Sequence, residues 1–260
     1  MELCNLDGEL EILINYTDEP AISLRGEVDF RNMDRISQAI FSLVERGKSS
    51  INIDLREVIF MDSTGVSALI DAANVIVPKG CSLRLITAGG QLSKVLSRCG
   101  MSGMFQYEQL GSLQPLAGGP SRPETRDVVE FEVPSQPQML SYIRARAADF
   151  ARSMPFSDDD IEDIKLAIGE AATNAIRHGT SRDCHKIKIR FERGKDEMKV
   201  FVIDRGCGFD PESICSTPID YMCEGGRGIM FMKALMNKVR FSSQKPGTCV
   251  EMTKKYQRQN

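Results

Sequence analysis

The chain has 260 residues, of which 42% are hydrophobic and 27% are charged, so it can bury two cores of ordinary size. Its 33 Lys and Arg residues are balanced by 36 Asp and Glu residues, which excludes the basic field of a DNA-binding protein. No apolar stretch has membrane-spanning length, no signal peptide is recognised at the N-terminus, and the eight cysteines include no Cys-x-x-Cys pair. We therefore expect a cytoplasmic protein with reduced thiols.

Strand and helix patterns alternate through the first half of the chain. They predict strands near residues 9–16 and 21–25, a helix near 33–46, a strand at 51–55, a helix from about Thr64, a strand at 82–86 and a helix near 91–99. This order is typical of an α/β fold with helices layered on a sheet. The segment Gly47-Lys48-Ser49 looks like the end of a phosphate-binding loop, but position 42 is Ser rather than Gly, so we interpret it as a helix C-cap.

The turn Asp62-Ser63-Thr64-Gly65 comes directly before the second predicted helix. Its polar side chains can satisfy the free N–H groups of the first helical turn. A hydroxyl in this place is also exposed, and the helix dipole tolerates a phosphate there. In this context, about residues 1–110 resemble a STAS domain of the anti-sigma factor antagonist type, and the resemblance implies that Ser63 is the phosphoacceptor.

Glycine and proline cluster at residues 111–125, where no hydrophobic period survives, so we expect a linker. The predicted domains are thus 1–112 and 128–260, joined by a linker at 113–127. The second domain begins with a strand at 128–133 and a helix at about 136–152. A helical pattern at 160–176, a buried strand at 200–203, a helical run at 229–238 and a strand from Thr248 follow.

Two polar residues of the 160–176 helix suit a magnesium nucleotide. Glu170 and Asn174 lie one turn apart on the same side of the helix. Because Mg²⁺ takes few protein oxygens and relies on substrate phosphates, the Asn174 carbonyl can anchor it. Glu170 can then orient or deprotonate an attacking hydroxyl.

The later elements offer groups for the rest of the nucleotide. Asp204 ends a buried strand, where its carboxylate can accept the exocyclic amine of adenine, and Gly206 and Gly208 let the backbone pass close to the ring. The glycine cluster at 225–228 precedes a helix and offers a loop and free N–H groups to phosphates. Thr248 offers a hydroxyl beside the purine.

Taken in order, these residues resemble the GHKL ATPase and kinase superfamily, specifically the small anti-sigma factor serine kinases, over about residues 128–260. The resemblance implies an ATP-binding α/β sandwich with ATP and Mg²⁺ as cofactors, Glu170 as the catalytic carboxylate and Asn174 as the Mg²⁺ ligand. The nucleotide contacts that it implies are Asn174, Asp204, Gly206, Gly208, Gly226, Arg227, Gly228 and Thr248.

Two positions need comment beside this resemblance. The lid reads Gly-Gly-Arg-Gly where the family more often has spaced glycines, so Arg227 is either a phosphate contact or a solvated side chain. The family uses its first helix for partner docking, which makes Arg144 a candidate, although an exposed helical Arg is usually only solvated.

The two resemblances together predict an ATP-dependent serine protein kinase fused to a domain of its own substrate class. It would phosphorylate a STAS serine, on its own domain or on a separate chain, and regulate transcription or signalling by partner switching with a sigma factor or another regulatory protein. The alternative is a nucleotide-binding switch without phosphoryl transfer, and Glu170 favours the enzyme because a sensor needs no catalytic carboxylate. The sequence is also compatible with a homodimer.

Two other ATPase classes fit less well. A histidine kinase needs an acceptor His ahead of the ATP motif, whereas His178 and His185 lie inside or after it. The gyrase and mismatch-repair ATPases need a transducer domain after the ATP fold, and none is expected because the sequence stops at Asn260.

Overall fold

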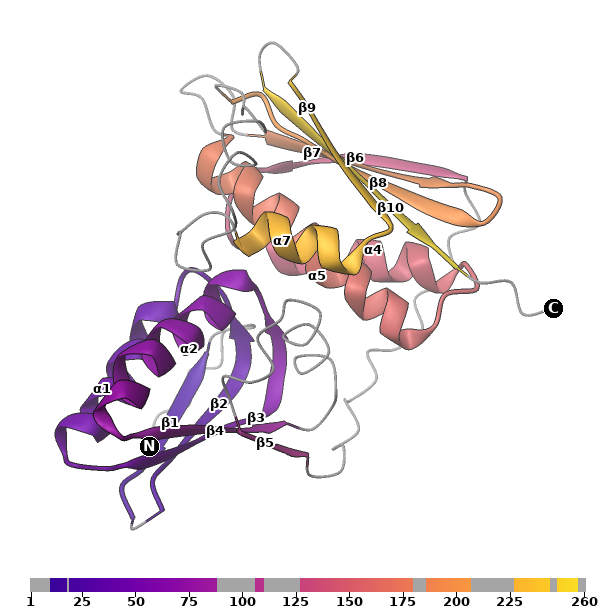
Figure 1. The fold of residues 1–260 in the computed structure, drawn as a ribbon. Helices are drawn as coiled ribbons and strands as arrows, with labels where there is room; N and C mark the ends of the chain where they lie inside the picture. The colour runs from indigo at the N-terminus through magenta and orange to yellow at the C-terminus, as the bar shows by residue number, and fades with distance from the viewer. Residues whose placement is uncertain are drawn as a thin grey trace, which may run out of the picture. The chain divides into compact units, whose positions relative to one another are not determined.

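The computed structural model describes residues 10–17, 19–87, 106–109, 127–179, 186–206, 227–243 and 247–256. The chain divides into two compact units, Met1–Ala117 and Gly118–Asn260 (Figure 1). The helix expected near 91–99 and the linker residues 113–126 lie outside the described residues. Among the described helices, none is both long and apolar enough to cross a membrane.

A five-stranded sheet in the order β1-β2-β3-β4-β5 forms the N-terminal unit (Figure 1). Its strands are β1 Glu11–Asn15, β2 Ala21–Val28, β3 Ser50–Met61, β4 Ser82–Thr87 and β5 Gln106–Gln109. β1 pairs with β2 in antiparallel fashion, and all other neighbours are parallel. The helices α1 Met33–Glu45 and α2 Ser63–Ile76 pack side by side on this sheet, and a short 3-10 helix, η1 Val77–Lys79, follows α2.

Alternation along the strands builds the core of this unit. Ile22 and Leu24 of β2 and Ile51 and Ile53 of β3 are at most 1% exposed. The period of two turns these side chains to one face of the sheet, which the helices cover. The fold is therefore the layered α/β arrangement expected from the sequence.

The end of α1 confirms the C-cap interpretation of the segment at 47–49. Gly47 has a φ of 75°, in the left-handed region. Its N–H donates to Val44 O at 2.9 Å, and the Lys48 N–H donates to Leu43 O at 3.2 Å. This pair of bonds is the Schellman motif that commonly ends a helix at glycine.

The parallel pairing of β2 and β3 places two carboxylates at one edge of the sheet. Val28 pairs with Met61, and Asp29 and Asp62 follow these two residues directly. The Asp62 N–H donates to Val28 O at 3.0 Å. A Cβ on Gly65 would lie 2.5 Å from Val28 Cγ1, so glycine is what lets α2 begin this close to β2.

The C-terminal unit has a five-stranded sheet in the order β6-β7-β8-β10-β9, in which every pair of neighbours is antiparallel (Figure 1). Its strands are β6 Val128–Pro134, β7 Lys186–Arg193, β8 Glu197–Ile203, β9 Lys238–Ser243 and β10 Thr248–Lys255. The helices α4 Met139–Arg152, α5 Asp158–His178 and α7 Arg227–Leu235 cover one face of it.

The longest helix, α5, is defined by its sequence at both ends. Ser157 is the N-cap, and its side chain and that of Asp160 form a reciprocal capping box. The helix ends at His178, two residues beyond the predicted helical pattern, with Gly179 as C-cap. Its buried face includes Ile164, Ala167 and Ile168, so packing as well as capping stabilises it.

The helical run expected at 229–238 is wrong at its C-terminal end. Helix α7 ends at Leu235, and β9 begins at Lys238. The Asn237 N–H donates to Thr253 O at 2.9 Å, which turns the chain onto β10. Val239 and Phe241 then alternate with exposed residues, a strand period that overrides the helical pattern.

Candidate functional site

The centre of the candidate site is the carboxylate of Asp204, at the end of β8. Its Oδ1 accepts hydrogen bonds from the N–H of Gly206 at 2.8 Å and from the N–H of Thr248 at 3.2 Å. Asp204 is 8% exposed, and burial raises the pKa of its carboxyl although these two hydrogen bonds lower it. In the part of the chain that the structure describes, no group donates to Oδ2, so this oxygen can accept a bond from a ligand.

Strand pairing brings Asp204 and Thr248 together. Ile203 of β8 pairs with Cys249 of β10, so Asp204 and Thr248 lie at the next position of the same ladder. The Asp204 N–H donates to Thr248 O at 3.0 Å. Thr248 is 7% exposed. The two residues are thus fixed to each other by the sheet.

Three glycines crowd the Asp204 turn. A Cβ on Gly179 would lie 2.5 Å from Asp204 Cγ, and a Cβ on Gly206 would lie 2.6 Å from the Gly179 carbonyl carbon. Gly247 has a φ of 116°, and its Cβ would lie 2.0 Å from Asp204 O. The end of α5 and the start of β10 therefore press directly on this turn.

Gly179 is a site residue that the sequence reasoning missed. Its only signal was a glycine directly after a helix, which by itself indicates a C-cap. What makes it part of the site is the contact with Asp204, a residue 25 positions away along the chain (204 − 179), and no local pattern reports such a contact.

Asn174 and Glu170 lie on helix α5 at increasing distances from the Asp204 turn. At about 1.5 Å per residue, Asn174 lies about 7–8 Å, and Glu170 about 13–14 Å, from Gly179 along the helix axis. Glu170 is 2% exposed, and Asn174 is half-buried. The helix packs on α7, β8 and β10, so its polar residues are held by the same elements that hold Asp204.

The glycine-rich lid is described only at its end. Arg227 is the first residue of α7, and Gly228 is buried. Gly208 and Gly226 lie outside the described residues. The structure places Arg227 and Gly228 on the first turn of α7. That residues 225–228 form a lid over the phosphates is still a prediction.

The acceptor turn of the N-terminal unit is a helix N-cap, as expected. Asp62 Oδ1 accepts from the Thr64 N–H at 2.9 Å, from the Gly65 N–H at 3.0 Å and from Thr64 Oγ1 at 2.5 Å. Ser63 is the first residue of α2 and is 6% exposed, so the expectation of an exposed hydroxyl is wrong. The capping carboxylate uses the N–H groups of the first turn, which explains why α2 begins here.

Arg144 lies in the middle of α4 and is 3% exposed. It is therefore not the solvated surface arginine that a helical position alone suggested. Its role in partner docking stays a prediction.

Comparisons with known proteins divide the chain in the same way. A STAS domain model matches residues 12–112, and a histidine kinase-like ATPase domain model matches residues 133–254. The serine-protein kinase RsbW of Bacillus subtilis (strain 168) is 36% identical over 137 residues, which cover 49% of this chain and 85% of that protein. RsbW of Bacillus cereus (strain Q1) is 32% identical over 144 residues, which cover 52% and 89%.

A solved structure of the RsbU and RsbW domains of a Mycobacterium tuberculosis protein is also similar, at 22% identity and a TM-score of 0.39. The match covers 49% of this chain and 32% of that chain, so this chain spans about a third of its length.

Proposed function

Because the chain belongs through its C-terminal unit to the family of the RsbW serine-protein kinases, and carries a STAS domain ahead of it, we propose that it transfers the γ-phosphoryl group of ATP to a STAS-domain serine. The observation that supports this most is the order of groups along α5. The Asp204 turn lies at the C-cap of the helix, Asn174 lies nearer its middle and Glu170 lies further still.

This order matches the order of parts in a nucleotide. Asp204 Oδ2 would accept the exocyclic amine of adenine, with Gly206 and Gly208 beside the ring and the Thr248 hydroxyl at its edge. Asn174 would hold Mg²⁺ by its side-chain carbonyl, which suits an ion that takes one or two protein oxygens and several phosphate oxygens. When bound, Mg²⁺ would neutralise charge on the phosphates.

The remaining groups would act on the transferred phosphoryl group. Gly226, Arg227 and Gly228 would close over the phosphates at the start of α7, where free N–H groups favour anions. Glu170 would orient the attacking serine hydroxyl and accept its proton. The serine oxygen forms a bond to the γ-phosphorus as the bond to the bridging oxygen breaks, and ADP leaves.

We propose Ser63 as the acceptor, modified by its own chain, by a second copy or by another kinase of this type. In that scheme the kinase unit binds a sigma factor or another regulatory protein, and the unphosphorylated STAS domain competes for the same kinase. Phosphorylation of the STAS domain would end that competition and reset the switch.

The direct test is incubation of the full chain with Mg-ATP, followed by mass spectrometry of the intact protein and of its peptides. We expect one phosphate on Ser63, lost in Ser63→Ala and kept in Thr64→Ala. Glu170→Gln should slow the transfer by roughly 10²–10⁴-fold, because a general base acts in the transition state, while nucleotide affinity changes only a few-fold. A series of protein concentrations separates transfer within one chain from transfer between chains.

Two outcomes would contradict the proposal. Phosphate that remains in Ser63→Ala but disappears in Thr64→Ala would move the acceptor to the other hydroxyl. Tight ATP binding without transfer to this chain or to any added STAS domain would favour a nucleotide-binding switch that lacks phosphoryl transfer.

A further inference from the structure

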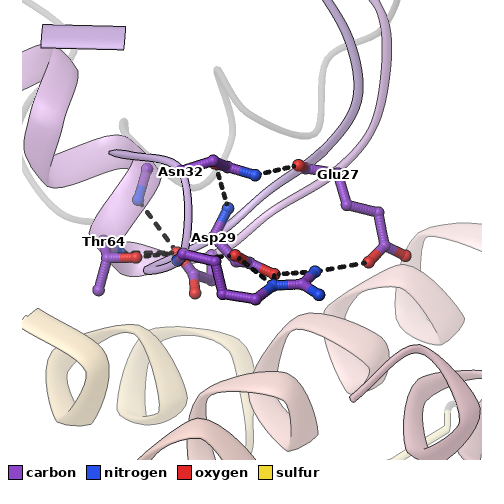
Figure 2. A network of polar contacts seen from close by, with 7 residues as sticks. Glu27, Asp29, Asn32 and Thr64 are labelled. Atoms are coloured by element: carbon purple, nitrogen blue, oxygen red, sulfur yellow. Dashed lines mark hydrogen bonds and ion pairs between the residues drawn. The ribbon is translucent and has the colours of Figure 1, made fainter. Parts of the chain in front are cut away.

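An ionic cluster lies beside the acceptor turn, where β2 and β3 end. It contains Glu27, Asp29 and Asn32, which are labelled in Figure 2, together with Arg31 and Asp62. Glu27, Asp29 and Asp62 are 8%, 0% and 1% exposed. The Asn32 side chain locks the loop after β2, because its Oδ1 accepts from the Asp29 N–H at 3.1 Å and its Nδ2 donates to Glu27 O at 2.9 Å. The cluster is therefore built into the end of the sheet.

Arg31 is the cation of this cluster, and Asp29 orients it. Its Nε donates to both carboxylate oxygens of Asp29 at 2.9 and 2.8 Å, and its Nη2 donates to Oδ2 at 2.5 Å. Nη2 also lies 3.9 Å from Glu27 Oε2. In the described parts of the chain, Nη1 has no acceptor, and the side chain is 35% exposed. A pre-oriented guanidinium thus keeps two N–H donors free.

Asp62 is satisfied on one side only. Its Oδ1 accepts the three hydrogen bonds of the cap, whereas Oδ2 is buried and has no partner among the described residues. Burial raises the pKa of this carboxyl, and the charge of Asp29 raises it further. The hydrogen bond to Asp29 raises the pKa of Arg31. Because Val28 pairs with Met61, Asp29 and Asp62 follow at neighbouring strand ends, and the loop that carries Arg31 lies beside the Asp62 turn.

A phosphate on Ser63 would need a cation at this turn. It brings about −1.5 to −2 charges next to Asp62. The N–H groups of Thr64 and Gly65, which a helix N-terminus normally offers to an anion, already bind Asp62 Oδ1. Among the described residues of this cluster, Arg31 offers donors that suit a phosphate, because a guanidinium binds phosphate oxygens with two parallel N–H bonds.

We propose that Arg31 is the phosphate receiver of the N-terminal unit: its free Nη1 donors bind the phosphate of phosphorylated Ser63 while Asp29 holds the guanidinium in place. This rests on the proposed role of Ser63 as acceptor. The phosphate then shares the guanidinium with Asp29 and Glu27, so modification of α2 is transmitted to the loop between β2 and α1.

The test uses phosphoserine installed at position 63 during translation of the full chain, so that it does not depend on kinase activity. The second pKa of the phosphate is measured by ³¹P NMR titration. A nearby guanidinium favours the dianion, so Arg31→Gln should raise this pKa by about one unit, the size expected for removal of an opposite charge. Arg31→Lys should give a phosphate pKa between those of the unsubstituted chain and Arg31→Gln, because lysine keeps the positive charge but lacks the paired N–H donors of the guanidinium.

The sheet offers a matched control in Arg56. Its Nε donates to both oxygens of Asp54 at 2.9 and 3.1 Å and its Nη2 to Oδ2 at 2.6 Å, and its side chain is 38% exposed. It repeats the geometry of Arg31 on Asp29, but it precedes Met61 by five residues, or about 16 Å of strand. Arg56→Gln should leave the phosphate pKa unchanged.

An equal phosphate pKa in the unsubstituted chain and in Arg31→Gln would overturn the proposal, as would an equal shift in Arg56→Gln. If Arg31→Gln fails to fold because Asp29 is left unpaired, the double variant Asp29→Asn/Arg31→Gln is compared with Asp29→Asn alone, so that the loss of the Asp29 charge is common to both and the difference reports Arg31. A kinase unit that never modifies Ser63 would contradict the proposed function but would leave this titration, and its answer about Arg31, intact.

Discussion

Each unit of the chain buries an ionic cluster, and the two clusters differ in how their polar groups are satisfied. In the C-terminal unit, Lys254 is 7% exposed and its Nζ donates to Asp163 Oδ2 at 2.7 Å and to Leu235 O at 2.9 Å, and it lies 3.2 Å from Asp160 Oδ1. An ammonium has three donors, and here all three have acceptors. In the described part of the N-terminal unit, Nη1 of Arg31 has no acceptor and Oδ2 of Asp62 has no donor.

The difference separates a structural cluster from a candidate site. Lys254 joins β10 to the first turns of α5 and to the end of α7, and it has nothing left to offer a ligand. Arg31, in contrast, has Nη1 donors without an acceptor among the described residues, on a side chain that is 35% exposed. By the proposal above, a phosphate on Ser63 brings acceptors for these donors.

Removal of Lys254 should have the largest effect. Lys254→Met leaves the carboxylate of Asp163 buried without its cation, and we expect the free energy of unfolding of the C-terminal unit to fall by about 3–5 kcal/mol. Hydrogen exchange of peptides from each unit, followed in urea by mass spectrometry, reports the two units separately. Peptides of the N-terminal unit should keep their protection.

The double variant Asp163→Asn/Lys254→Met is the control, since it removes both charges and should recover much of the loss. A loss below about 1 kcal/mol in Lys254→Met would mean that the cluster is not a structural tie, because a surface ion pair contributes that little.

Gly247→Ala should have the next largest effect on stability, and it tests the Asp204 turn of the C-terminal unit. The positive φ of Gly247 and the 2.0 Å approach of an added Cβ to Asp204 O mean that the Asp204 turn must move. We expect the C-terminal unit to lose about 2–3 kcal/mol of unfolding free energy, the upper range for a strained backbone position. Affinity for ATP and ADP, measured by isothermal titration calorimetry, should fall alike.

Gly47→Ala is the matched control in the N-terminal unit. Gly47 also has a positive φ, but an added Cβ would meet no heavy atom within 4 Å. The substitution should cost only about 1–2 kcal/mol, the penalty of the left-handed conformation alone, and leave nucleotide affinity unchanged. Equal losses of nucleotide affinity in both variants would show that Gly247 acts through general strain and not through Asp204.

Local patterns in the sequence predicted much of this arrangement. The alternation around Ile51 and Ile53, the Schellman end of α1 at Gly47 and the capping aspartate at 62 each depend on neighbours in the chain. The strands β5, β7 and β9 were not predicted. β5 has only four residues, β9 begins where the helical pattern of α7 seemed to continue, and the alternation of charged and apolar residues in β7 is a strand signal that the sequence reasoning missed. Pairing with a central strand decides their structure.

Contacts between residues that are far apart in the chain could not be predicted from the sequence. No sequence pattern distinguishes Asp29 or Arg31, and only the register of β2 against β3 brings them to the Asp62 turn. Lys254 is one of two adjacent lysines at the end of a strand, a pattern that does not indicate burial, yet its side chain is buried and bonds to α5 and α7. Buried charges of this kind are recognised only when their partners are known.

The smallest expected effect is on the pH dependence of stability, where the two clusters should differ in sign. Burial raises the folded-state pKa of Asp62 above its unfolded value, so the folded N-terminal unit binds more protons and loses stability as the pH rises through that window. Burial also acts to raise the pKa of Asp160, but hydrogen bonds from Ser157 and Lys254 outweigh it and lower the pKa. The ionised Asp160 therefore stabilises the folded C-terminal unit above the unfolded pKa of Asp, and this stabilisation is lost as the pH falls through the folded-state pKa.

Asp62→Asn and Asp160→Asn isolate these two contributions when each is compared with the unsubstituted chain across pH 3 to 8, a range that spans the unfolded pKa of Asp of about 3.9. Asp62→Asn keeps a capping oxygen, and it should become more stable relative to the unsubstituted chain as the pH rises, by at most about 1.4 kcal/mol per pH unit for one proton. Asp160→Asn should become less stable relative to the unsubstituted chain as the pH rises. Hydrogen exchange of peptides from each unit measures the two stabilities separately. If Asp62→Asn instead became relatively less stable as the pH rises, the hydrogen bonds of the cap would outweigh burial, and the carboxyl beside Ser63 would be stabilised as an anion in the folded state.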